Sequence, residues 1–157
     1  MCQGRYKKIL AFEADKANYD MLCHNVTENK WENIQCFNIG LWSEKACLKF
    51  KAEGCASGNI ALDGEVPIEC DTLDHIVNGM PVNYIKMDIE GSELSALIGA
   101  NKTICAYTPL LAISVYHRID DFITIPNYIL QCNPNYHLYF RHYRRYTSFE
   151  TICYGIP

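Results

Sequence analysis

The chain has 157 residues, of which 49% are hydrophobic and 20% charged, and its formal net charge is −4. This length fits a single domain, residues 1–157, with enough chain to bury a core. The acidic balance argues against a dedicated nucleic-acid partner. No apolar run reaches membrane-spanning length, and Met1–Arg5 lacks the apolar stretch of a signal peptide. We therefore expect a cytoplasmic protein with no membrane or nucleic-acid partner.

The nine cysteines do not follow a metal-binding pattern. No two of them are spaced as C-x-x-C, and structural zinc sites use such closely spaced pairs. We expect no metal site, and we interpret most of the cysteines as buried thiols in a reducing compartment.

The first half of the chain alternates extended and helical patterns. The apolar run Lys8–Glu13 predicts a strand. Asp15 is a good N-cap for the helix that follows, whose apolar face comprises Tyr19, Leu22, Cys23 and Val26. The small, polar segment Glu53–Asn59 predicts a loop. Three further strands are expected, at Ile34–Asn38, Ala46–Phe50 and Val66–Cys70.

The second half continues the same alternation. Asp71 or Thr72 caps a short helix that runs through Val77. Strand Asn83–Met87 follows, and then a helical pattern to about Cys105. The remaining elements are strand Leu110–Val115, helix Phe122–Gln131, and strands Tyr136–Arg141 and Phe149–Gly155. This order predicts a Rossmann-like α/β fold: a mainly parallel sheet with helices on both faces and an antiparallel C-terminal strand pair.

Carboxylates stand where two of the predicted strands end. Glu13 closes the first strand, and Asp88 and Glu90 follow strand Asn83–Met87. Ligands of open α/β sheets bind at the carboxyl ends of strands, so this pattern favours a site. A carboxylate such as Glu13 typically binds a ribose diol, although a solvated acid is the alternative. The glycine loop that usually lies about 20 residues before such an acid is missing, since Gly4 is the only upstream glycine.

One segment, Ile85–Glu93, carries the most specific pattern in the chain, IKMDIEGSE. Further segments accompany it in order, at Ala11–Asp15, Asn38–Ser43, Thr72–Asp74, Arg141–Tyr143 and Glu150-Thr151. Together they resemble the FkbM-type S-adenosylmethionine-dependent methyltransferases, from about residue 8 to the C-terminus. The resemblance lacks the family's opening glycine motif and first strand. It therefore implies a class I methyltransferase fold that is incomplete at its N-terminus.

The resemblance also implies an activity and a set of binding residues. The family mostly methylates hydroxyls of sugars and natural products, so the expected partner is a small-molecule or glycan hydroxyl acceptor, with S-adenosylmethionine as cofactor. By resemblance, Glu13 holds the ribose, Asn38 and Ile39 lie beside the adenine, and Asp88 lines the pocket near the methionine portion or the acceptor. A homo-oligomer is compatible with the sequence.

A hydroxyl acceptor needs a proton acceptor within hydrogen-bond reach. His117, after strand Leu110–Val115, is the best-placed group, and Asp88 is the alternative. A surface histidine is the plainer interpretation of His117. We predict that Asp88 and His117 lie close together, because they end strands that should be neighbours. Glu90 and Glu93 are alternatively explained as acids that complement the first turn of a helix.

Two other functions stay open at this point. One is a degenerate domain that keeps the fold without catalysis and serves as a binding or assembly module, which the missing glycine loop favours. The other is a nucleotide-binding oxidoreductase that uses the same ribose carboxylate. Because the first strand of the resembled fold is missing, we expect Lys8–Glu13 to pair directly with Asn83–Met87. Weak cofactor binding is then expected. The alternatives are a strand supplied by another chain, or a larger protein of which these residues are a part.

Overall fold

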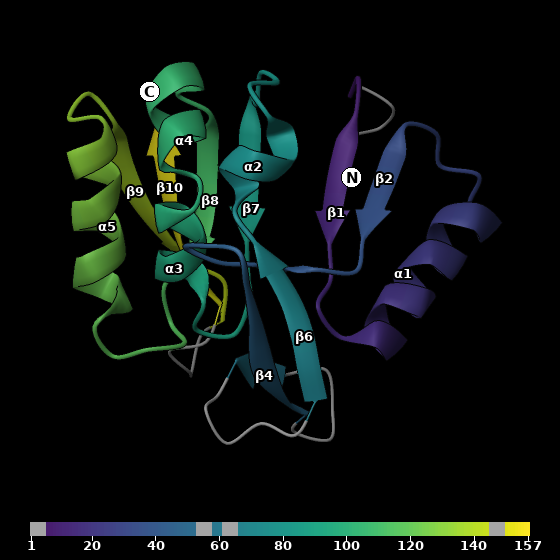
Figure 1. Ribbon diagram of the computed structural model, residues 1–157. Helices are drawn as coiled ribbons and strands as arrows, with labels where there is room; N and C mark the ends of the chain where they lie inside the picture. Colours follow the sequence, from purple (N-terminus) through teal and green to yellow (C-terminus); the bar gives the residue numbers. More distant parts are fainter. Residues whose placement is uncertain (1–5, 53–57, 61–65, 145–149) are drawn as a thin grey trace. The chain divides into compact units, whose positions relative to one another are not determined.

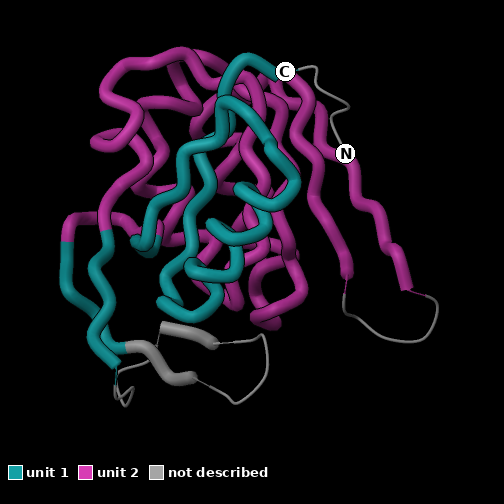
Figure 2. The backbone as a smooth tube through the Cα atoms, turned by 90° about the vertical axis from the view of Figure 1, so that its right-hand side faces the viewer, with its two compact units in different colours: residues 1–40, 46–70 teal, residues 41–45, 71–157 magenta. Residues whose placement is uncertain are grey.

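The computed structural model of the chain describes residues 6–52, 58–60, 66–144 and 150–157 (Figure 1). The chain falls into two compact units, residues 1–40 with 46–70, and residues 41–45 with 71–157 (Figure 2). Within the described ranges, none of the helices has both the length and the apolar character needed to span a bilayer. The single domain expected from the sequence remains a prediction.

The first unit begins with a parallel strand pair joined by a helix. Strand β1 (Ile9–Phe12) pairs with β2 (Ile34–Phe37) in parallel, and the Phe12 and Phe37 rings stack at 5.0 Å. Helix α1 (Lys16–Glu28) connects them. Its N-cap is Asp15, whose Oδ1 accepts a hydrogen bond from the Asn18 N–H at 2.9 Å. The predicted strands and N-cap are confirmed here, because local sequence signals determine them.

A second sheet runs in the order β3-β6-β4-β5. Its strands are β3 (Gly40–Leu41), β4 (Ala46–Ala52), β5 (Gly58–Ile60) and β6 (Val66–Asp71). Strand β4 pairs antiparallel with both β5 and β6. The loop expected over Glu53–Asn59 is wrong for Gly58 and Asn59, which belong to β5 and pair with β4. Residues 53–57 lie outside the described ranges.

The second unit is built on the sheet β7-β8-β10-β9 (Figure 1). Its strands are β7 (Tyr84–Met87), β8 (Leu110–Ser114), β9 (His137–His142) and β10 (Thr151–Ile156). Strands β7 and β8 are parallel, whereas β10 is antiparallel to both β8 and β9. The antiparallel C-terminal pair is thus confirmed. This sheet is mixed, β1 and β2 form a parallel pair, and both described pairings of β4 are antiparallel, so a mainly parallel sheet is not confirmed.

Four helices belong to the second unit, and the longer ones lie on one face of its sheet (Figure 1). They are α2 (Leu73–Val77), α3 (Glu93–Ile98), α4 (Asn101–Tyr107) and α5 (Asp121–Cys132). Leu97, Ile104 and Ile129 from three of them are completely buried. In the described part of this unit, Tyr84 and Leu110 of the sheet remain exposed. The expectation of helices on both faces of one sheet remains a prediction.

The single helical pattern expected up to Cys105 is broken into α3 and α4 at Gly99. A Cβ atom at Gly99 would lie 2.0 Å from the backbone oxygen of Trp42, so the backbone approaches too closely for a side chain. The carboxylate of Asp74 then caps α4 by accepting hydrogen bonds from the Lys102 and Thr103 N–H groups at 2.9 and 2.8 Å. The break is set by a contact distant in sequence, which the helical pattern does not reveal.

The expected pairing of the first strand with Asn83–Met87 is also wrong. In the described residues, β1 pairs with β2 in a two-stranded sheet and β7 pairs with β8. Each pair is joined through helical chain, α1 between β1 and β2 and α3 with α4 between β7 and β8, as in a βαβ unit.

The cysteines are less buried than expected. Cys70 and Cys153 are buried, and burial raises the pKa of each thiol to about 11. Cys47 and Cys105 are exposed. The others in the described ranges, Cys23, Cys36 and Cys132, are half-buried. The interpretation of most cysteines as buried thiols is therefore wrong, although all of these thiols are free.

Replacing Gly99 by alanine should destabilise the protein strongly. The new methyl group meets a backbone oxygen that cannot move without displacing Trp42, and overpacking of this kind costs about 1–3 kcal/mol or more. Urea unfolding of G99A measures the loss. G79N is the comparison, because Gly79 has open space around it and the substitution therefore brings only the strain of φ +80°, which asparagine tolerates better than other side chains. Equal stability of G99A and the parent would contradict the contact.

The carboxylate of Asp71 should make stability depend on acid pH. Burial alone would raise the pKa of Asp71, but the hydrogen bonds from His75 and the Thr72 N–H outweigh it, and the pKa is lowered. A lowered folded-state pKa stabilises the protein above the ordinary value of about 3.9. That contribution disappears as the pH falls through the lowered pKa. D71N should therefore cost about 1–3 kcal/mol at pH 7 and converge with the parent in acid, as followed by urea unfolding across pH.

Candidate functional site

The site is built on the tight turn between β7 and α3. Glu90 and Gly91 both have positive φ, at 55° and 91°. The turn is held by Glu93, the first residue of α3, whose side chain has no exposed surface. Its Oε1 accepts a hydrogen bond from the Ile89 N–H at 2.8 Å, and its Oε2 accepts one from the Gly91 N–H at 2.9 Å. One buried carboxylate thus fixes the backbone of the turn.

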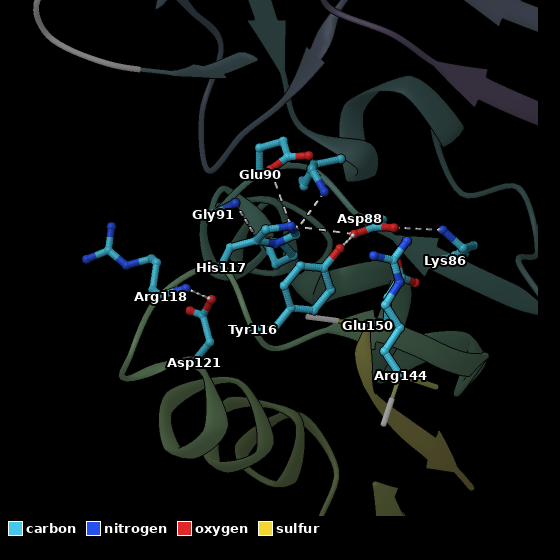
Figure 3. A network of polar contacts seen from close by, with 12 residues as sticks. Lys86, Asp88, Glu90, Gly91, Tyr116, His117, Arg118, Asp121, Arg144 and Glu150 are labelled. Atoms are coloured by element: carbon cyan, nitrogen blue, oxygen red, sulfur yellow. Dashed lines mark hydrogen bonds and ion pairs between the residues drawn. The ribbon is translucent and has the colours of Figure 1, made fainter. Parts of the chain in front are cut away.

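His117 is brought to this turn by the pairing of β7 with β8. The two strands are parallel neighbours, with Met87 opposite Ile113, so the segments after them leave the same edge of the sheet. The imidazole Nδ1 lies 2.8 Å from Glu93 Oε1, and Nε2 lies 3.4 Å from Glu90 Oε2 (Figure 3). Only 8% of the His117 side chain is exposed. The interpretation as a surface histidine is wrong.

The carboxylates around His117 determine its protonation. Burial alone would lower the pKa of this imidazole. The contact with Glu93 and the charges of Glu90 and Asp88 act in the opposite direction and outweigh burial, so the pKa lies above its ordinary value. Neither ring nitrogen has a partner in hydrogen-bond geometry among the described residues. The short Nδ1 contact with Glu93 is therefore electrostatic.

Asp88 lies at the open side of the site, with 37% of its side chain exposed. Its Oδ1 is 3.6 Å from His117 Nε2 and accepts a hydrogen bond from the Tyr116 hydroxyl at 3.0 Å (Figure 3). Lys86 Nζ is 3.6 Å from the other oxygen, Oδ2. Burial, followed by the bond to Asp88, raises the pKa of Tyr116, so the phenol stays protonated and donates.

The segment that carries His117 is fixed at its far end by Asp121. This carboxylate is buried, and its Oδ2 accepts a hydrogen bond from the Arg118 N–H at 2.9 Å (Figure 3). Burial raises the pKa of Asp121. Because Arg118 directly follows His117, this bond limits the movement of the imidazole.

The residues expected to bind the cofactor's nucleoside lie in the first unit. Glu13 follows β1, and its Oε1 accepts a hydrogen bond from the Asp15 N–H at 2.8 Å. Asn38 follows β2 and donates through Nδ2 to the backbone oxygens of Glu13 and Ala14, at 2.9 and 3.1 Å. Ile39 comes next and is half-buried. Glu13 and Asn38 are thus neighbours at the ends of two paired strands, and their binding roles remain predictions.

The predicted proximity of Asp88 and His117 is confirmed, whereas their catalytic roles remain predictions. Sequence reasoning missed two contributors, Glu93 and Tyr116. The sequence predicts Glu93 only as an acid in the first turn of a helix, but its side chain also contacts the imidazole of His117, which lies in a distant segment. Its hydrogen bonds to the turn could have been anticipated, because Glu93 lies two residues after Gly91. Nothing local reveals its contact with His117.

We predict that E93A costs far more stability than E90Q. Removing the Glu93 carboxylate leaves the half-buried N–H groups of Ile89 and Gly91 without their acceptors, at up to about 1–3 kcal/mol for each. E90Q removes a charge from a partly exposed side chain and should change stability by about 0.5 kcal/mol or less. Thermal and urea unfolding compare the two. Similar losses in both variants would contradict a special role for Glu93 in the turn.

Two comparisons with known proteins point to the same family. A family model described as the methyltransferase FkbM domain matches residues 2–146. A crystal structure of the FkbM methyltransferase from Methylobacillus flagellatus KT is similar to this chain, with a TM-score of 0.80 and 30% sequence identity. The similarity covers 98% of this chain and 38% of that one, so this chain spans well under half of that protein's length. No curated protein sequence matches the chain.

Proposed function

Because this chain belongs to the FkbM methyltransferase family, we propose that it takes part in S-adenosylmethionine-dependent methylation of a carbohydrate-like or natural-product hydroxyl. The observation that carries the proposal is the buried imidazole of His117 beside the carboxylate of Asp88. His117 can accept a proton, and it lies beside Asp88 at the carboxyl end of β7, where ligands of α/β sheets bind. The cofactor, the acceptor class and the roles of individual residues all belong to the proposal.

The first step of the proposal is that Glu13 and Asn38 hold the nucleoside. They end the parallel strands β1 and β2 side by side. A carboxylate accepts hydrogen bonds from both hydroxyls of a ribose diol, and the Glu13 bond to Asp15 engages only Oε1. The Glu13 carboxylate therefore offers the acceptors that the two hydroxyls of a ribose need. S-adenosylmethionine, when bound, supplies an electrophilic methyl group.

The second step concerns the proton of the acceptor hydroxyl. His117 is our first choice as its acceptor, through Nε2, which faces the partly exposed Asp88 and Glu90. Their charges stabilise the imidazolium that forms. Asp88 is the alternative proton acceptor, because it is the more exposed of the pair. These groups also position the hydroxyl of the substrate, and that positioning supplies the remaining catalysis.

Isothermal titration of the full chain with S-adenosylhomocysteine tests cofactor binding. E13A should weaken binding by the loss of charge-assisted hydrogen bonds, on the order of 1.5–3 kcal/mol. E13Q is the matched variant, because its side-chain oxygen still accepts from the Asp15 N–H while the charge is gone. Both should bind more weakly than the parent and remain folded. If the two bound as tightly as the parent, the ribose assignment would be wrong.

The same titration separates the proposal from a binding or assembly module without cofactor. A chain that binds no S-adenosylhomocysteine supports the module. For catalysis, the chain is incubated with S-adenosylmethionine and a panel of sugar and polyketide hydroxyls. H117A should lower the rate 10²–10⁴-fold, the usual cost of losing a general base. Near-normal turnover of H117A would remove histidine from that role and leave Asp88.

A further inference from the structure

We propose that Asp88, Glu93 and His117 form a binding site for a divalent metal cation. Each of the three offers one ligand atom, and these atoms all lie within 4.8 Å of one another. The cysteine spacing predicts no metal site, and the ligands proposed here are instead two carboxylates and an imidazole. They come from the β7–α3 turn and from the segment after β8, which the strand pairing fixes side by side.

The buried imidazole is the observation that points to a ligand. With 8% of its side chain exposed, His117 has little access to water. Its Nδ1 contacts Glu93 Oε1 at 2.8 Å, whereas Nε2 has only longer contacts, at 3.4 Å with Glu90 and 3.6 Å with Asp88, and no partner in hydrogen-bond geometry within the described ranges. A buried polar group without a partner destabilises the fold. A metal ion is a partner that an imidazole nitrogen surrounded by carboxylates accepts readily.

The charge around the imidazole also favours a cation. Asp88, Glu90 and Glu93 surround His117, so even a protonated ring leaves an excess of negative charge. Lys86 contributes only from outside, at 3.6 Å from Asp88 Oδ2, with its side chain more than half exposed. An exposed pair of this kind compensates little of that charge.

The geometry and the donor types narrow the kind of cation. Two ligands bonded at about 2.1 Å to one metal are roughly 3–4 Å apart. His117 Nε2 and Asp88 Oδ1, at 3.6 Å, already have this spacing, and the full set, which lies within 4.8 Å, closes slightly when one ion contacts all three. One nitrogen with two carboxylate oxygens suits Mn²⁺, Fe²⁺ or Zn²⁺. The backbone bonds to Glu93 and the Tyr116 bond to Asp88 hold the ligands in orientation, as outer contacts do in metal sites.

The cation also has a consequence for catalysis, and this part rests on the proposed methylation. An acceptor hydroxyl that joins the cation as a further ligand has its pKa lowered. With the cation bound, His117 is a ligand and the hydroxyl's proton leaves to solvent, so the proton-acceptor role proposed above for His117 applies to the cation-free chain. Cation binding itself does not depend on any methyl transfer.

Titration of the full chain with Mn²⁺, followed by electron paramagnetic resonance of the free ion, tests the site. The parent should bind one Mn²⁺ per chain, and Zn²⁺ should displace it. D88N should weaken binding by more than about tenfold, and H117Q should do the same. Asp88 is partly exposed, so D88N is expected to stay folded, which circular dichroism checks. The matched control is E28Q, which removes an exposed charge from α1 and should bind like the parent.

Several outcomes would overturn the cation site. They are a parent chain that binds no Mn²⁺, a folded D88N that binds it as tightly as the parent, and an E28Q that loses affinity as much as D88N. The last result would mean diffuse attraction to an acidic surface. Failure of the proposed function gives a different pattern, in which S-adenosylhomocysteine does not bind while Mn²⁺ still does. A chain that binds S-adenosylhomocysteine but no Mn²⁺ refutes the cation site and leaves the proposed function standing.

Discussion

The buried carboxylate of Glu93 is the interaction on which the site depends. It accepts hydrogen bonds from two backbone N–H groups of the turn and contacts the imidazole of His117. A charged group without exposed surface is costly unless it is fully engaged. The turn and the imidazole together provide that engagement. One side chain therefore couples the shape of the backbone to the position of the titratable group.

The sheet of the second unit brings Asp88 and His117 together. Parallel pairing of β7 with β8 sends both following segments from one edge, and Leu97, Ile113 and Ile125 of the same unit are completely buried. Asp88 and His117 thus meet without either strand being distorted. The side chains at the open side, Asp88 and Lys86, stay accessible to a ligand.

Local signals in the sequence were enough to predict most elements and part of the site. Apolar runs located β1 and β8, and Asp15 located the start of α1. The proximity of Asp88 and His117 followed from strand order. Other features that depend on contacts between distant segments were not predictable. The break at Gly99 requires the backbone of Trp42, and strand directions require pairings that no local pattern encodes.

The turn that carries the site also has a kinetic consequence. The amide hydrogens of Ile89 and Gly91 point at a carboxylate that water does not reach. Their exchange with solvent deuterium requires the turn to open, and opening releases the imidazole at the same time. The exchange rate of these two amides therefore measures how often the turn opens and separates Glu93 from His117.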